Sequence, residues 1–308
     1  MTPRIVPPPR PDAPTPGQRL AGYRRIALIV PAAGDLGTVL DRAVRLLPER
    51  CPWLLAAAGY RLAPGDRLTL EAATDPAIFP GDSVIGQPVA GWAAARGDPL
   101  IVVDRPAFRG PGPEGGSVAA APIVRLNGAV VGALEVVAGA PWDLLDGDAQ
   151  GLRQLGQALA RLAPVDHPER RPPAATRNAM RPLVEAYRAA VRDFAARLTL
   201  LPELSTPDSD WTGREIRLRL TCREAEAVSA LTECLAGVWE DIPDDAGERN
   251  AAGLARQAGL SRQQVEALST QVHRELRRTL ALCTDEELAR EPRIGAWVEA
   301  LTRHYRDH

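Results

Sequence analysis

The order of apolar and polar positions predicts a mixed α and β domain over residues 20–163. Apolar residues recur at helical spacing in three segments, which predicts helices at residues 34–49, 84–95 and 142–162. Short apolar or alternating runs predict strands at residues 53–62, 68–71, 100–103, 118–126 and 129–137. The last two runs are joined by Asn127-Gly128, and Asn-Gly between apolar runs is the strongest short hairpin signal. We therefore expect a sheet that includes a β-hairpin.

Three proline-rich segments divide the chain. Residues 1–18 predict a disordered tail, because repeated prolines fit neither a helix nor the interior of a sheet. Residues 164–176 predict a linker between domains, and residues 202–213 predict a second break before the last helical block. The sheet domain is therefore expected to end before residue 164.

Residues 177–200 form the first helical element after the linker. Their apolar residues recur at alternating steps of four and three, which is a heptad seam. The seam residues are Met180, Val184, Tyr187, Val191, Phe194 and Leu198. Our interpretation is a dimerisation helix that makes the protein a homodimer. The alternative is an amphipathic helix that packs within its own chain, because only about three heptads are present.

Two short apolar stretches near the C-terminus are separated by Gly259. The first contains Leu254, Ala255 and Ala258, and the second contains Leu260, Val265, Leu268 and Val272. Gly259 can supply the positive φ of a tight turn, and Ser261 is a good N-cap for the second helix. This spacing predicts a helix-turn-helix, whose second helix enters the DNA major groove. An ordinary helical hairpin uses the same spacing and stays open as the alternative.

Residues 220–231, LTCREAEAVSAL, resemble the opening of the LuxR-type helix-turn-helix family, and a second block that resembles it begins at Ser261. The resemblance implies a divergent helix-turn-helix over about residues 216–283, inside a helical domain at residues 214–308. Two features depart from the family. Residues 238–249 form an acidic insertion between the blocks, and Glu266 stands where the family usually has a basic residue. A sigma-factor-like or winged variant stays open for that reason.

The predicted recognition helix carries the residues expected to touch DNA. Arginine and glutamine side chains hydrogen-bond to guanine and adenine edges, and arginine also binds phosphate. The expected base readers are Arg262, Gln263 and Gln264, and the expected phosphate contacts are Arg274, Arg277 and Arg278. Over residues 215–285 the acidic residues outnumber the arginines, which disfavours strong non-specific binding to DNA.

Three motifs in the sheet domain resemble those of the GAF family and occur in that family's order. They are residues 81–104, 115–137 and 142–162, with Trp142 in place of the usual Phe. The resemblance covers about residues 20–163. It implies an α+β GAF-type sheet domain followed by an all-α C-terminal helix-turn-helix domain. A PAS-like or profilin-like sheet without a ligand is the alternative.

A small-molecule effector in such a domain would lie beside the segment after the second strand. Arginines next to aromatic rings can hold an anionic or planar ligand. The candidate ligand-binding residues are Phe79, Trp92, Asp104, Arg105, Phe108 and Arg109. Solvated loop charges would give the same pattern, so a domain without a ligand stays open.

Residues able to carry chemistry are sparse in the sheet domain. Residues 1–166 contain no histidine, which disfavours haem, and residues 52–221 contain no cysteine, which disfavours bilin or thiol chemistry. The cysteines lack the spacing of a zinc site. We therefore expect no cofactor, no metal site, no catalytic residue and a protein that is not an enzyme.

Composition narrows the class of protein. The chain has 308 residues, of which 45% are hydrophobic and 25% charged, and its formal net charge is −2. These values are typical of globular domains and give no general affinity for nucleic acid. No apolar run approaches the roughly 20 residues of a membrane span. We expect a cytoplasmic protein with no membrane partner.

These expectations combine into one leading functional hypothesis. A GAF-type domain would sense a small molecule or a partner, and a helix-turn-helix would bind duplex DNA as part of a dimeric transcription regulator. The alternative is a non-enzymatic signalling scaffold whose helical domain binds a protein instead of DNA. An enzyme built on the same sheet fold is a third hypothesis, because fold does not determine function.

Overall fold

A computed structural model of the chain separates into two compact units, residues 12–174 and 175–308, apart from the short segments 1–11 and 232–240. Each unit is described by itself. The residues that the structure describes are 13–30, 34–79, 81–87, 89–103, 116–140, 142–162, 164, 167–200, 212–236, 257 and 259–307.

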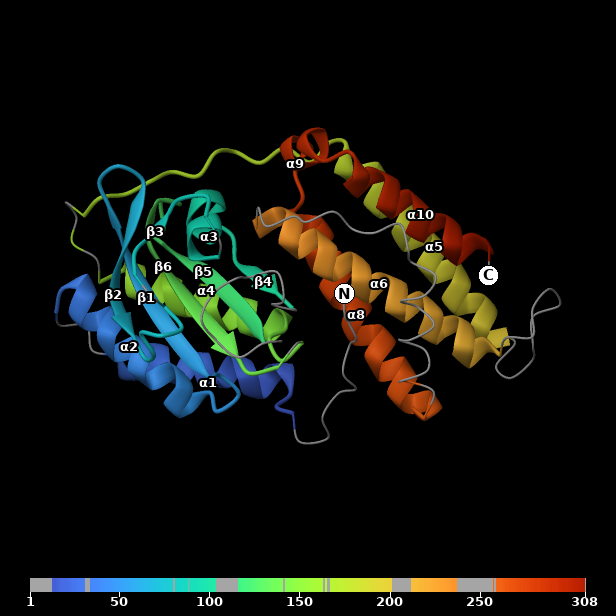
Figure 1. Cartoon of the computed structure of the whole chain (residues 1–308), viewed down its shortest axis with the longest axis horizontal. Helices are drawn as coiled ribbons and strands as arrows, with labels where there is room; N and C mark the ends of the chain where they lie inside the picture. The colour runs from blue at the N-terminus through green and yellow to red at the C-terminus, as the bar shows by residue number, and fades with distance from the viewer. Residues whose placement is uncertain are drawn as a thin grey trace. The chain divides into compact units, whose positions relative to one another are not determined.

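The first unit is built on a six-stranded antiparallel sheet with the order β3-β2-β1-β6-β5-β4 (Figure 1). Its strands are β1 (Ala56–Ala63), β2 (Arg67–Ala73), β3 (Ser83–Val84), β4 (Leu100–Val102), β5 (Ser117–Val124) and β6 (Val130–Ala138). The three central strands β1, β5 and β6 are almost completely buried. These three strands have long apolar sequences because both faces of the sheet are covered there.

Four helices accompany the sheet: α1 (Pro16–Ile29), α2 (Leu36–Arg50), α3 (Ala90–Arg96) and α4 (Asp146–Ala160). Helix α2 packs on β1 and β2, α4 packs on β5 and β6, and α1 packs against α4 (Figure 1). Helix α3 also contacts β5 and β6. The α+β sheet domain expected from the sequence is confirmed in its element order.

The β5–β6 hairpin forms at the expected dipeptide. Val124 pairs with Val130, and the Asn127 side chain accepts a hydrogen bond from the Ala129 amide at 3.0 Å. Gly128 has a φ of 82°, a left-handed conformation that residues with a Cβ rarely adopt. The Asn-Gly signal therefore identified both the turn and the residue that permits it.

The N-terminal part of the sheet domain differs from the prediction. Helix α1 begins at Pro16, inside the segment expected to be a disordered tail, while residues 1–12 lie outside the described part of the chain. Thr15 and Gln18 form a reciprocal capping box that starts the helix. The proline at the first helical position is compatible with this start, because its missing N–H would have no partner inside the helix.

Part of the predicted linker packs against the sheet domain. Arg170 forms an antiparallel bridge with Val130, and the His167 ring lies 3.0 Å from the carbonyl oxygen of Val131 through Nε2. His167 is buried and Arg170 pairs with Asp66. Residues 167–170 therefore extend the sheet domain beyond the predicted boundary at residue 163.

In the second unit, helices are the only regular elements among the described residues between 175 and 307. These are α5 (Met180–Leu200), α6 (Gly213–Ala236), α8 (Arg262–Leu282), α9 (Asp285–Arg290) and α10 (Arg293–Asp307). Helices α10 and α5 pack along each other, and α5 also contacts α8 (Figure 1).

The heptad seam of α5 is covered in part by its own chain. Met180, Tyr187 and Phe194 are buried, α10 packs along α5, and Val184 and Val191 are half-buried. The buried half of the seam fits the alternative of an amphipathic helix packed within the chain. A dimerisation helix at residues 177–200 stays a prediction, and so does the homodimer.

Replacing Gly128 with alanine tests the hairpin. We expect Gly128→Ala to lower the free energy of unfolding of the sheet domain by about 1–2 kcal/mol, because alanine is strained at positive φ. Gly139→Ala is the matched control, since a Cβ there would meet nothing and its φ is not positive. Urea unfolding of both variants gives the comparison. Equal effects at the two positions would contradict the role of the turn.

Candidate functional site

Two of the six residues predicted to bind a ligand are described by the structure. Phe79 follows β2 and Trp92 lies in α3, and both are buried. The Arg96 guanidinium lies 5.6 Å from the centre of the Trp92 ring. Residues 104–115 lie outside the described part of the chain. The pocket therefore stays a prediction for Asp104, Arg105, Phe108 and Arg109.

The only cysteine in residues 1–221 is buried beside the sheet. Cys51 ends α2, and burial raises the pKa of its thiol to about 12, with the negative charge of Asp148 acting in the same direction. A nucleophilic cysteine needs a lowered pKa and access to solvent. Cys51 has neither, so its environment is that of a packed side chain.

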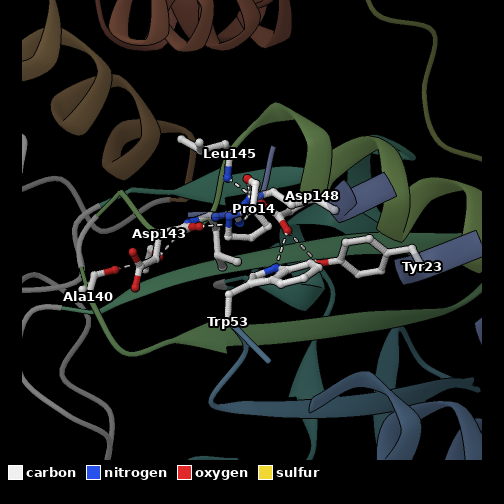
Figure 2. A network of polar contacts seen from close by, with 10 residues as sticks. Pro14, Tyr23, Trp53, Ala140, Asp143, Leu145 and Asp148 are labelled. Carbon is white, nitrogen blue, oxygen red and sulfur yellow. Dashed lines mark hydrogen bonds and ion pairs between the residues drawn. The ribbon is translucent and has the colours of Figure 1, made fainter. Parts of the chain in front are cut away.

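A buried carboxylate lies close to Cys51 and was not anticipated from the sequence. Asp148, in the first turn of α4, accepts hydrogen bonds from Arg19 at 2.7 Å, Tyr23 at 3.0 Å and Trp53 at 2.8 Å (Figure 2). The backbone amide of Leu145 donates a fourth bond at 2.8 Å. Burial raises the pKa of the carboxyl, and the Arg19 charge opposes this shift. We call these four side chains the Asp148 cluster.

The other contacts of the Asp148 cluster identify it as an anchor for α1. Arg19 also donates to the carbonyl oxygens of Asp143 at 2.6 Å and Pro14 at 3.2 Å, and it lies 5.1 Å from the centre of the Trp53 ring (Figure 2). Tyr23 meets Trp53 edge to face. Both carboxylate oxygens of Asp148 are thus satisfied by protein donors. The cluster joins α1 to α4 and to the segment before β1.

The second candidate surface is helix α8, the predicted recognition helix. Ser261 is its N-cap, as expected, and forms a capping box with Gln264: the Ser261 amide donates to the Gln264 side chain at 2.8 Å. Gly259 does not have the positive φ expected of the turn. The preceding helix cannot be compared, because residues 254–256 and 258 lie outside the described residues.

Of the six residues predicted to contact DNA, three have side chains bonded to other residues of α8 or to its N-cap, and three have exposed side chains without such a bond among the described residues. Gln264 is held by the capping box, and Arg262 pairs with Glu266 at 3.3 Å one turn later. Arg278 pairs with the buried Glu275 at 2.9 Å, so it supports the helix. Gln263, Arg274 and Arg277 are exposed. Neither arginine forms an ion pair with a carboxylate of the described residues.

The open side chains share one face of α8. Its buried face consists of Val265, Leu268, Val272, Leu276 and Leu280. On the other side, Gln263, Ala267, Thr270, Arg274 and Arg277 are exposed and recur every three or four residues. We call this second set the open face of α8. It is a continuous helical surface with two arginines near its C-terminal end.

Helix α8 is held in place by a second buried carboxylate. Glu224 of α6 accepts hydrogen bonds from Tyr187 of α5 and from Tyr305 of α10, the latter at 2.7 Å. The Nδ1 atom of His273 in α8 lies 3.1 Å from the same Glu224 oxygen. Burial raises the pKa of both phenols, and the charge of Glu224 adds to the shift. We call these four side chains the Glu224 cluster.

The Glu224 cluster was also missed by the sequence reasoning. Glu224 belongs to the block LTCREAEAVSAL, which was compared with a family motif and given no structural role. The sequence offered one signal for this cluster, which is that the charged residue Glu224 stands between apolar positions of a predicted helix. That pattern does not show which partners will satisfy a buried charge, since Tyr187, His273 and Tyr305 are far away in the sequence.

Comparisons with known proteins give structural matches only. No protein-family model and no curated protein matches the chain. A structure described as a GAF sensor protein from Burkholderia vietnamiensis is 22% identical, with 49% of this chain and 96% of that chain covered and a TM-score of 0.42. The GAF domain of an Acinetobacter phosphoenolpyruvate-protein phosphotransferase is 17% identical, with coverages of 47% and 91% and a TM-score of 0.40.

A third match is the free methionine-R-sulfoxide reductase of Neisseria meningitidis in complex with its substrate. It is 19% identical, with coverages of 52% and 93% and a TM-score of 0.43. Each of these matches covers about half of this chain. At this similarity the matches carry no argument about function, and the resemblance of residues 20–163 to GAF domains stays a prediction from the three motifs.

The expectation that the protein is not an enzyme is contradicted by these comparisons. Several of the matched structures are free methionine-R-sulfoxide reductases, which are enzymes. The expectation of no membrane partner was tested separately: among the described helices, none is both long and apolar enough to cross a bilayer.

Removing the Asp148 carboxylate tests the anchor of α1. Asp148→Ala leaves the buried Arg19 charge without its counter-charge, so we expect a loss of about 3–5 kcal/mol in the free energy of unfolding. Asp146→Ala, two residues earlier in the same turn, should cost less than about 1 kcal/mol. Chemical denaturation measures both. The double change Arg19→Met with Asp148→Ala should recover part of the loss, and its failure to do so would contradict an ion-pair role.

Thiol labelling tests the environment of the cysteines. All four are free and buried, and burial raises the pKa of Cys51 and of Cys222 to about 12. A raised pKa keeps a thiol protonated below that value, so at pH 8 only about one such thiol in 10,000 is ionised. We expect an aromatic disulfide reagent to react slowly with the native protein and rapidly after unfolding in urea. Rapid labelling of native Cys51 would contradict the packed assignment.

Proposed function

We propose that this protein is a signal-responsive transcription regulator. Its GAF-type sheet domain would sense a small molecule or a protein partner, and its helical unit would contact duplex DNA through the open face of α8. The observation that carries the DNA proposal is the division of α8 into a buried apolar face and an exposed face with two arginines free of described acidic partners.

The geometry of α8 supports a revised set of contacts. Gln263 has an exposed side chain next to the helix N-terminus, where a recognition helix usually meets base edges. Arg274 and Arg277 lie about three to four turns further along and suit phosphate contacts. Arg262, Gln264 and Arg278 are already engaged within the helix, so we assign them no direct DNA contact.

The Glu224 cluster supports the same proposal mechanically. A helix that reads a groove needs a rigid attachment, because its side chains must be held in register with the bases. His273 attaches α8 to Glu224 at its middle, and the apolar face packs on either side of that point. A homodimer is part of the proposal, since two symmetric helices would match two half-sites on DNA.

A second candidate function is binding of a protein with an acidic surface. The pairing of Arg262 with Glu266 neutralises the positive charge near the start of α8, where DNA recognition would need it most. The open arginines at the other end would still attract carboxylates. A DNA-binding measurement separates the two functions.

Fluorescence anisotropy with short duplexes at low salt tests the DNA proposal. We expect the chain to bind duplex DNA with affinity that falls as salt is raised. The double variant Arg274→Gln with Arg277→Gln should lower the slope of log affinity against log salt by about two. Arg303→Gln, an exposed arginine of α10, is the matched control and should leave the slope unchanged.

A substitution at Glu266 tests the same proposal through an increase in DNA affinity. Glu266→Gln removes the partner of Arg262 and should increase affinity, because the freed guanidinium becomes available to DNA. If neither the wild-type chain nor Glu266→Gln binds duplex DNA at low salt, the DNA proposal fails. Protein binding through the same face then replaces it.

A further inference from the structure

A hollow in the helical unit lies among helices α5, α6, α8 and α10. Its volume is about 340 Å³, which is at the lower end of small-molecule sites. The lining residues that matter are Arg217, Phe194, Ser269, Arg274, Arg277 and Tyr305. We refer to this space as the arginine hollow, and we propose that it binds a small organic anion with an aromatic or apolar body.

Charge is the first argument. Arg217, Arg274 and Arg277 line one space, and no aspartate or glutamate is among the described residues that line it. None of the three forms an ion pair with a carboxylate of the described residues, whereas Arg278 and Arg293 of the same unit do. Three like charges around one space repel one another unless an anion lies between them. The carboxylate of Glu224, which contacts Tyr305 and His273 beneath the hollow, offsets part of this charge, and the three arginines leave an excess of positive charge.

The second argument is the positions of the guanidinium groups relative to the buried phenols. Burial and the charge of Glu224 raise the pKa of Tyr305, and the charge of Arg217 opposes that shift. Burial and the charge of Glu224 likewise raise the pKa of Tyr187, and the charge of Arg277 opposes it. Arg217 of α6 and Arg277 of α8 therefore both act on the Glu224 cluster, of which Tyr305 and His273 line the hollow.

The third argument is that the aromatic lining of the hollow is rigid. Phe194 and Tyr305 meet edge to face, with ring centroids 5.4 Å apart. The Tyr305 hydroxyl is fixed by its 2.7 Å bond to Glu224, and His273 is fixed beside the same carboxylate. A ligand that binds here would not have to order these rings, which lowers the entropic cost of binding.

Together these features define the class of ligand. Arginine holds phosphate and carboxylate groups through paired N–H donors, so the three guanidinium groups favour a doubly charged head. Phe194, Val191 and Leu220 give the hollow an apolar side that suits a ring. An aryl phosphate or an aromatic dicarboxylate has both parts. This inference shares Arg274 and Arg277 with the DNA proposal, and Arg217 of α6, which is not part of the open face of α8, distinguishes the two.

Isothermal titration calorimetry on the whole chain at low ionic strength tests the proposal. Phenyl phosphate is the probe for the complete ligand class, inorganic phosphate for the charged head alone, and benzyl alcohol for the ring alone. We expect phenyl phosphate to bind saturably at one site per chain with a dissociation constant below about 1 mM. Inorganic phosphate should bind more weakly and benzyl alcohol should give no saturable heat. Absence of saturable binding of phenyl phosphate up to about 10 mM overturns the proposal.

Variants locate the site. Arg217→Gln should weaken phenyl phosphate binding at least tenfold, about the effect of losing one charged hydrogen-bonded contact. Arg277→Gln, at an exposed position, should do the same without threatening the fold. Arg303→Gln is the matched control and should bind like wild type. Unchanged binding in both hollow variants, or an equal loss in Arg303→Gln, overturns the location.

A DNA-binding measurement on the same variants distinguishes a small-molecule site from a surface that contacts the phosphates of duplex DNA. Arg217→Gln should leave DNA affinity within about twofold of wild type while phenyl phosphate binding falls. If Arg217→Gln instead weakens DNA and leaves phenyl phosphate binding unchanged, the hollow is part of a DNA surface and the small-ligand proposal fails. If DNA does not bind at all, the calorimetric result still decides the ligand proposal by itself.

Discussion

The helical unit depends on how one buried negative charge is satisfied. Glu224 is fully buried, and an unpaired carboxylate in such a position would destabilise the fold by several kcal/mol. Tyr187, Tyr305 and His273, from three other helices, all contact its Oε1 atom, while its Oε2 atom has no hydrogen-bond partner among the described residues. Each helix can move away only by leaving the carboxylate with fewer donors. The position of α8, and hence of its open face, follows from this constraint.

The sheet domain solves the same problem with different donors. Asp148 is also fully buried, and it receives an arginine, a phenol, an indole and a backbone amide. Two of these donors come from α1, so the carboxylate explains why a helix that adds little to the sheet itself is held against α4. Both oxygens of Asp148 are used for structure. Glu224 differs in this respect, because only one of its oxygens accepts hydrogen bonds from the described residues.

Local signals in the sequence predicted local structure well. Asn127-Gly128 identified a turn whose glycine has positive φ, and Ser261 identified the start of α8, because each depends on the backbone within a few residues. The seam of α5 was less informative, since a heptad pattern shows that a face is apolar but not whether α10 or a second chain covers it. Asp148 and Glu224 could not be recognised as the centres of hydrogen-bonded clusters, because their donors are up to 129 and 81 residues away in the sequence. The candidate ligand residues at 104–109 lie outside the described residues and stay predictions.

The arginines of α8 connect the two proposed roles of the helical unit. Arg274 and Arg277 belong both to the open face and to the lining of the arginine hollow. An anion held in the hollow would neutralise the same charges that a DNA phosphate would need, so each would weaken the binding of the other by an equal factor. The coupling needs no movement of α8, which the Glu224 cluster opposes. If both proposals hold, ligand occupancy reduces DNA affinity through competition for charge, and raising the salt concentration diminishes both binding reactions.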